Sequence, residues 1–503
     1  MNAAVATGPA APALDALLAR YRSAAADPGA APPTTLVIGG TESGAGLQGV
    51  FRSWLSGDRE RGDESLGPRH ERTLRLGERV WLSDENGDVR EFTGVLARRE
   101  RTMRFIESGD FADQPERCVL HGPVKLGPLQ TYALDVTQAQ GQTETLYLDA
   151  STYLPDRLAY DDDDGRTTID FSDWRTVAGR RYAFTNVTSD GDHAFDTTET
   201  TTSVEPGTRI AASIFAPLVP RTIEMNAPET VALKEREGHF YAPVTIGGRA
   251  FTFLIDTGAQ NIVLDRRVVA ELGLPSVGSL EASGASRTGG LSLAQLPQLV
   301  VGTRGTLSDL VVTTLDLGAS TEGAFRIDGI LGYPFFASSL VHFDPAGRSL
   351  TFGPPSSFVP SGQRVVISTD RAFPEATFRI NGSLDAPFIV DTGNAAELLL
   401  YHPFMERHGG IVEFSQTNRH SYGIGGITSS YRTSLAELAI AGIPLYRVET
   451  DVMLATSGAF ADRFDAGNVG LGVLRNFDMT FDLAHDAFYV ERGRNYDDGR
   501  SRN

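Results

Sequence analysis

The sequence has little cysteine and no long hydrophobic run. Cys118 is the one cysteine among 503 residues, which excludes an internal disulfide framework and a metal cluster built on several cysteines. We expect it to act as a small buried hydrophobic residue. No stretch approaches the roughly 18 consecutive apolar residues that span a bilayer. The sequence therefore predicts no transmembrane segment.

Basic residues are also scarce. The chain has 45 Lys and Arg against 64 Asp and Glu, for a formal net charge of -19. Nucleic-acid binding depends on clustered positive charge, so this balance argues against a nucleic acid as the main partner. The simplest role of the excess negative charge is solubility.

The motifs of several enzyme classes are missing. The nine histidines include no His-Glu-x-x-His pair, which would place two zinc ligands on one helical face. The sequence has no Gly-x-Ser-x-Gly elbow of a serine hydrolase and no Gly-Lys-Ser/Thr after a glycine-rich run. We therefore predict neither a metal site nor a nucleotide or other cofactor.

Glycine and proline, by contrast, are abundant. The 53 Gly and 26 Pro separate many short apolar runs, a pattern typical of strands and turns. This favours a mostly β fold with few helices. Residues 13–26 are an exception, because apolar side chains recur there at helical spacing and predict a short amphipathic helix.

The length predicts about three domains, and local patterns suggest where they lie. Alternating strands and turn dipeptides extend over residues 35–205, and prolines punctuate the stretch that follows. The predicted organisation is an N-terminal segment with a short helix (1–34), a β-rich domain (35–205), a linker (206–229), two further domains (230–360 and 361–492) and a tail (493–503).

A series of aromatic and turn motifs runs through the β-rich domain. They follow in the order Phe51–Trp54, Val80–Asp84, Asn86–Gly87, Tyr153–Leu158 and Phe171–Arg175. This succession resembles the lipoprotein-carrier fold of bacterial periplasms, which implies a curved antiparallel sheet wrapped over helices. It also implies a periplasmic, envelope or secreted location. The Ala-rich start after Met1 lacks signal-peptide features, and it fits a chain from which a signal has been removed.

The second half of the sequence contains an internal repeat. In each copy two short strands lead to an Asp-Thr-Gly tripeptide: Phe240–Gly248 precedes Phe253–Ala259, and Ala376–Gly382 precedes Phe388–Asn394. Asp256 and Asp391 are therefore equivalent positions, 135 residues apart. Each copy also closes alike, with Ile330-Leu331-Gly332 in the first and Gly470-Leu471-Gly472 aligned with it in the second.

This repeat resembles the retropepsin-like aspartic peptidases, here as two β lobes fused in one chain over about residues 230–492. The resemblance implies that Asp256 and Asp391 are the catalytic pair, so that a monomer is sufficient for the active site. It also implies two supporting loops, Thr257-Gly258-Ala259 and Thr392-Gly393-Asn394, with the threonine hydroxyls bonded across the lobe interface.

Two departures from the family pattern concern the second lobe. Asn394 stands where Ala or Ser is usual, and Gly470 stands where the closing element has an apolar residue.

The chemistry explains why two carboxyl groups are needed. Two carboxylates within hydrogen-bond reach cannot comfortably both ionise, so the pair holds a shared proton, as in aspartic proteases generally. The ionised member can take a proton from a water that attacks a peptide carbonyl, and the protonated member can supply one to the departing amine. Gly258 and Gly393 are expected to let the backbone turn tightly behind each carboxylate.

A peptidase of this kind also needs a hairpin that closes over the substrate and excludes water. Tyr422, Gly423, Gly425 and Gly426 lie between the second Asp loop and its closing element, where such a flap belongs. The counterpart in the first lobe contains Gly284. An ordinary glycine-rich turn is the alternative interpretation.

The sequence therefore predicts an aspartic endopeptidase that hydrolyses peptide bonds in a peptide or protein substrate. Two alternatives stay open. One is a catalytically weak protein that binds peptides without cutting them. The other is a lipid- or lipoprotein-binding envelope protein with accessory peptidase lobes.

Overall fold

The structure is a computed structural model, and it describes residues 12–163, 165–283, 287–318, 326–412, 417–423 and 426–500. Strands dominate these residues, and the prediction of a mostly β fold is confirmed. Residue contacts divide the chain into two compact units. The N-terminal unit comprises Met1–Val80, Phe92–Asp162 and Arg166–Pro217, and the C-terminal unit comprises Trp81–Glu91, Asp163–Gly165 and Leu218–Asn503.

The first thirteen strands form one antiparallel sheet. They are β1 (Thr35–Gly44), β2 (Leu47–Ser56), β3 (Arg59–Leu66), β4 (Arg69–Leu76), β5 (Arg79–Ser83), β6 (Val89–Glu91), β7 (Cys118–Leu126), β8 (Leu129–Thr137), β9 (Thr143–Asp149), β10 (Pro155–Asp161), β11 (Arg166–Val177), β12 (Arg180–Ser189) and β13 (Thr197–Pro206). Their order is β6-β5-β4-β3-β2-β1-β13-β12-β11-β10-β9-β8-β7. Neighbours in space are thus neighbours in sequence, except where β1 pairs with β13.

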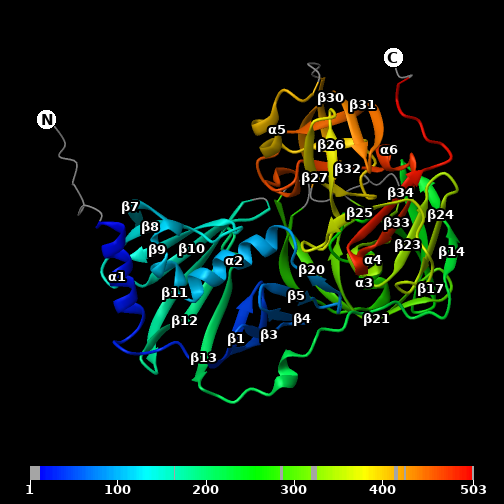
Figure 1. The fold of residues 1–503 in the computed structure, drawn as a ribbon. Helices are drawn as coiled ribbons and strands as arrows, with labels where there is room; N and C mark the ends of the chain where they lie inside the picture. Colours follow the sequence, from blue (N-terminus) through cyan, green and yellow to red (C-terminus); the bar gives the residue numbers. More distant parts are fainter. Residues whose placement is uncertain are drawn as a thin grey trace. The chain divides into compact units, whose positions relative to one another are not determined.

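Two helices, α1 (Leu14–Ala25) and α2 (Val95–Glu107), pack against this sheet (Figure 1). Their shared core contains Leu17, Leu18, Tyr21, Phe105 and Ile106 from the helices, with Leu134, Val136, Leu146, Leu148 and Leu158 from the strands. The predicted helix at residues 13–26 is confirmed. Cys118 lies in the same core as a free thiol, as expected, and burial raises its pKa to about 11.

The C-terminal unit contains two further sheets. Their strands are β14 (Glu229–Ala232), β15 (Lys234–Arg236), β16 (His239–Ile246), β17 (Arg249–Ile255), β18 (Val263–Asp265), β19 (Ser276–Ser283), β20 (Arg287–Val301), β21 (Gly305–Leu315), β22 (Gly329–Leu331), β23 (Leu340–Asp344), β24 (Ser349–Gly353), β25 (Gln363–Ser368), β26 (Glu375–Ile380), β27 (Leu384–Val390), β28 (Leu398–Leu400), β29 (Thr417–Gly423), β30 (Gly426–Ile440), β31 (Ile443–Met453), β32 (Gly467–Val469), β33 (Phe477–Asp482) and β34 (Ala487–Arg492).

Short helices join these strands. The α-helices are α3 (Arg266–Leu272), α4 (Tyr333–Ala337), α5 (His402–His408) and α6 (Leu471–Leu474). Short 3-10 turns occur at Asp110–Asp113, Pro115–Arg117, Ala212–Phe215, Ala459–Ala461 and Leu483–His485. None of the described helices is long and apolar enough to cross a membrane.

The same strand order occurs twice in the C-terminal unit. One sheet runs β15-β16-β17-β22-β18-β21-β20-β19, and the other ends in β26-β27-β32-β28-β31-β30-β29. We call β15 to β22 lobe 1 and β26 to β32 lobe 2. In each lobe the strand before the aspartate pairs in parallel with a short strand, β17 with β22 and β27 with β32. The backbone environment of the two aspartates is therefore built in the same way.

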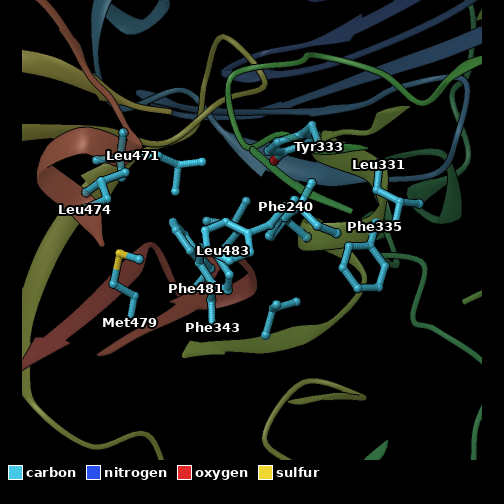
Figure 2. Close-up of a cluster of buried hydrophobic side chains, with 14 of the residues drawn as sticks. Phe240, Leu331, Tyr333, Phe335, Phe343, Leu471, Leu474, Met479, Phe481 and Leu483 are labelled. Atoms are coloured by element: carbon cyan, nitrogen blue, oxygen red, sulfur yellow. The ribbon is translucent and has the colours of Figure 1, made fainter. Parts of the chain in front are cut away.

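Strands from outside the two lobes join them behind the aspartate loops. β23 pairs antiparallel with β33, with Val341 opposite Phe481 and Phe343 opposite Met479. Figure 2 shows part of this core, in which Phe240, Phe343, Phe481 and Leu483 lie between Leu331 and Phe335 on one side and Leu471, Leu474 and Met479 on the other. One hydrophobic core thus supports both aspartate loops.

Candidate active site

Each predicted catalytic aspartate directly follows a strand. Asp256 comes after β17 and Asp391 after β27. The backbone N–H of Asp256 donates to the carbonyl oxygen of Leu331 (3.1 Å), and that of Asp391 donates to the carbonyl oxygen of Val469 (3.0 Å). The last bond of each parallel pairing therefore holds the aspartate at the start of its loop.

The structure brings the two carboxyl groups together, where they hydrogen-bond each other. Within each loop, Gly258 N–H donates to Oδ1 of Asp256 (2.9 Å) and Gly393 N–H donates to Oδ1 of Asp391 (2.7 Å). Asp256 is only 9% exposed. Burial, the charge of Asp391 and the hydrogen bond with Asp391 raise the pKa of Asp256 well above its usual range, against the opposing N–H bonds from Gly258 and Ala259. The pair can therefore hold one proton and one negative charge.

The two glycines are needed for a different reason from the one expected. Neither Gly258 nor Gly393 has a positive φ, so neither supplies a backbone turn that other residues avoid. A Cβ on Gly258 would lie 2.6 Å from Cγ of Asp391, and one on Gly393 would lie 2.2 Å from Cγ of Asp256. Each glycine makes room for the carboxyl group of the opposite loop.

The two threonines connect the loops reciprocally. The Thr257 hydroxyl donates to the carbonyl oxygen of Val390 (2.6 Å) and accepts from Thr392 N–H (3.0 Å). The Thr392 hydroxyl donates to the carbonyl oxygen of Ile255 (3.0 Å) and accepts from Thr257 N–H (3.1 Å). Both side chains are 1% exposed. These four bonds are buried and link the strand ends of the two lobes. The threonines therefore help to fix the distance between the two carboxyl groups.

The closing element of lobe 2 differs from the one that the sequence alignment gave. Two residues before each aspartate, Leu254 pairs with Ile330 in lobe 1 and Ile389 pairs with Asn468 in lobe 2. Asn468-Val469-Gly470 therefore takes the place of Ile330-Leu331-Gly332. The alignment with Gly470-Leu471-Gly472 was wrong by two residues.

Gly332 and Gly470 meet the same obstacle, which supports this register. A Cβ on Gly332 would lie 2.1 Å from the carbonyl oxygen of Asn261, and one on Gly470 would lie 2.3 Å from that of Ala396. Gly470 of lobe 2 is thus the counterpart of Gly332 in lobe 1, and it does not replace an apolar residue. The apolar residue before it is Val469, which is fully buried.

Asn468 is a site residue that the sequence analysis missed. Its side-chain Nδ2 donates to Oδ2 of Asp391 (2.5 Å), and its Oδ1 accepts from Nδ2 of Asn394 (2.9 Å). Asn394, the unusual residue of the second loop, is thereby two hydrogen bonds away from the carboxyl pair. The signal was available, since aligning Gly470 with Gly332 places Asn468 opposite Ile330.

His239 is a second residue that was missed. It begins β16, and its ring lies within electrostatic reach of Asp391. Burial lowers its pKa, against the opposing effects of Gly393 and Asp391, and its Nδ1 is buried without a hydrogen-bond partner. No sequence motif singled it out.

The predicted flap of lobe 2 lies on a long hairpin. Strands β29 and β30 pair antiparallel up to Tyr422 opposite Ile427 and Gly423 opposite Gly426. The corresponding hairpin of lobe 1 joins β19 and β20, with Ser283 opposite Arg287. Gly425 and Gly284 lie outside the described residues. A closing role for either hairpin stays a prediction.

The arrangement can perform acid–base chemistry on a bound water, because a buried carboxyl pair can accept one proton while it donates another. Among the described residues, no group of three or more His, Cys, Asp and Glu side chains is arranged to hold a metal ion.

One comparison with known proteins finds a match in lobe 1. A family model described as aspartyl protease matches residues 242–335, a range that includes Asp256, Thr257, Gly258 and the closing element Ile330-Leu331-Gly332. No curated protein matches the chain.

Solved structures of a different kind are similar to about 40% of the chain. They include a DUF1329 family protein from Desulfovibrio piger (14% identity, 40% of this chain and 95% of that chain, TM-score 0.30) and a putative outer membrane lipoprotein-sorting protein domain from Vibrio parahaemolyticus (14%, 40% and 95%, 0.28). A LolA superfamily protein from Nitrosomonas europaea is similar too (12%, 41% and 99%, 0.28). The family match agrees with the resemblance to aspartic peptidases that the sequence suggested.

Proposed function

We propose that the protein is an aspartic endopeptidase and that Asp256 and Asp391 are its catalytic pair. The observation that carries the proposal is the hydrogen-bonded carboxyl pair, each member held by the same set of backbone contacts. The family match over residues 242–335 supports the same class of activity. The charged carboxyl group activates a water, and the protonated one supplies a proton to the leaving amine.

The substrate is a peptide segment in extended conformation. Extended peptides bind through main-chain hydrogen bonds to strand edges and hairpins, while alternate side chains enter pockets. The hairpins β19–β20 and β29–β30 are the parts of the lobes proposed to close over such a segment. The recurrence of one strand order in the two lobes supports treating residues 230–360 and 361–492 as duplicated domains.

Cleavage of a peptide library at about pH 4 to 6, where such a pair holds a single proton, tests the proposal. Asp256→Asn and Asp391→Asn should each lower kcat by about 100- to 10,000-fold, the usual contribution of a general acid or base. Asp309→Asn is a matched control, because Asp309 is an exposed aspartate on β21 of lobe 1. Equal cleavage by all four proteins would contradict the assignment of the pair.

A catalytically weak peptide-binding protein is the alternative that the same experiment separates. Two departures from the family pattern, at Asn394 and at Gly470, favour this alternative. The corrected register of Asn468-Val469-Gly470 removes the second of them. Peptide binding by wild-type protein without cleavage at any pH would favour it over the peptidase.

A further inference from the structure

We propose that Asn468 is a positioning residue that keeps Asp391 as the charged member of the carboxyl pair and Asp256 as the protonated member. The inference rests on the proposed peptidase activity and assigns a direction to it. It concerns a side-chain hydrogen bond that Asp391 accepts and for which Asp256 has an apolar side chain at the corresponding place.

A chain of hydrogen bonds determines which end of the Asn468 amide faces the pair. The backbone N–H of Ala396 can only donate, and it donates to Oδ1 of Asn394 (2.9 Å). The Nδ2 group of Asn394 must then be the end that meets Asn468, where it donates to Oδ1 (2.9 Å). Asn468 is left with its Nδ2 group toward Oδ2 of Asp391 (2.5 Å). Since an amide NH₂ group has no lone pair to offer, this contact requires Asp391 to accept.

This contact favours charge on Asp391. Both oxygens of Asp391 accept an N–H bond, Oδ1 from Gly393 and Oδ2 from Asn468. Hydrogen bonds donated to a carboxylate stabilise its ionised form. They are also stronger than bonds between neutral groups.

Asp256 has an apolar neighbour at the corresponding place. Ile330 occupies the position of Asn468 and is 1% exposed. Asp256 receives only backbone N–H bonds, from Gly258 and Ala259, and burial raises its pKa. The lobe 1 environment therefore favours the protonated form, whose proton lies in the hydrogen bond between the two carboxyl groups.

Other titratable groups near Asp391 do not supply this asymmetry. Burial lowers the pKa of His239, which disfavours its positive charge. Tyr401 lies within electrostatic reach of Asp391, is 1% exposed, and has its pKa raised by burial, so it stays neutral. With no cation among these two neighbours, the neutral amide of Asn468 is the group that distinguishes the two aspartates.

The reaction then has a defined direction. Asp391 accepts a proton from the attacking water while the oxygen of that water bonds to the peptide carbon. Asp256 gives its proton to the amine as the C–N bond breaks. The proton gained by Asp391 then passes to Asp256 through their hydrogen bond, which restores the starting state with no other reactant.

The dependence of kcat/KM on pH tests this inference, because its acid limb reports ionisation of the base in the free enzyme. Asn468→Ile gives lobe 2 the residue of lobe 1. It should move the acid limb upward by about one pH unit, the size expected for a lost bond to a charged group. The double variant Asn468→Ile with Ile330→Asn moves the amide to Asp256 and should return the limb toward its wild-type position.

The outcomes separate this inference from the proposed function. If the wild-type protein cleaves peptides but Asn468→Ile only lowers kcat by the same factor at every pH, the amide has a merely structural role and the inference is wrong. If Asn468→Ile does not fold, Asn394→Ala tests the same chain of bonds, because it releases the amide that orients Asn468. An unmoved limb in that variant also overturns the inference. Absence of cleavage by wild type would instead contradict the proposed function.

Discussion

Lobe 1 and lobe 2 have the same backbone around their aspartates but different side chains beside them. The parallel strand pairs, the glycine contacts and the threonine bonds occur in both lobes. The side chains differ at several corresponding places, among which Ile330 matches Asn468 and Ala259 matches Asn394. The comparison teaches that shared backbone contacts can bring two carboxyl groups together, while unshared side chains decide which of them carries the proton.

The largest expected effect comes from filling the space beside the carboxyl groups. Gly393→Ala should abolish most activity, by about 100-fold or more, because misplacing a catalytic group by about 1 Å has that effect. Gly258→Ala should lower the activity less. A Cβ at position 258 would lie 2.6 Å from the facing carboxyl carbon, whereas a Cβ at position 393 would lie only 2.2 Å from the carboxyl carbon that it faces. Steady-state kinetics of the two variants measure the difference. Full activity in either variant would contradict the close packing of glycine and carboxyl group.

The corrected closing element predicts the next largest effect. Gly470→Ala should destabilise the protein by about 3 kcal/mol, because its Cβ would meet the backbone oxygen of Ala396 at 2.3 Å and overpacking costs about this much. Leu331→Val, which gives lobe 1 the apolar residue of lobe 2, is the matched control and should cost about 1 kcal/mol. Urea unfolding measures both. A smaller loss for Gly470→Ala than for Leu331→Val would restore the alignment with Leu471.

The threonines should behave alike in the two lobes. Thr257→Val and Thr392→Val each remove one donated and one accepted bond and leave buried backbone groups unpaired. Each should therefore cost about 2 kcal/mol or more. Thermal and urea unfolding of both variants should give losses that agree within about 1 kcal/mol, since the bonds are reciprocal. A clear difference between the two losses of stability would show that the threonine bonds are not equivalent in the two lobes.

The smallest effect is a pH dependence of stability. The raised pKa of Asp256 means that the folded protein binds this proton more tightly than the unfolded chain does. Its contribution to stability is therefore present at low pH and is lost as the pH rises from about 4 toward the folded-state pKa. Asp256→Asn removes the titration, so its Tm should rise relative to wild type as the pH increases.

Asp309→Asn again serves as the control for that measurement, because it changes an exposed aspartate of the same lobe. A constant difference in Tm between Asp256→Asn and wild type across the pH range would mean that Asp256 does not titrate within it.

Part of the site could be predicted from local sequence and part could not. Two Asp-Thr-Gly tripeptides, each after a pair of short apolar strands, identify Asp256 and Asp391 because strand and turn patterns are local. The closing element is ambiguous, since both Asn468-Val469-Gly470 and Gly470-Leu471-Gly472 contain an apolar residue followed by glycine. The pairing of β32 with β27 and the matching contacts of Gly332 and Gly470 distinguish them.

The sequence by itself determined the mostly β composition, the helix at Leu14–Ala25 and the pair of aspartate loops. Each of these features depends on a pattern that lies within one short segment of the chain. The tertiary structure decided what each glycine faces and which end of the Asn468 amide meets Asp391. Such relations join residues that are 74 to 137 positions apart, and they depend on strand register, which a single sequence does not encode in any one segment.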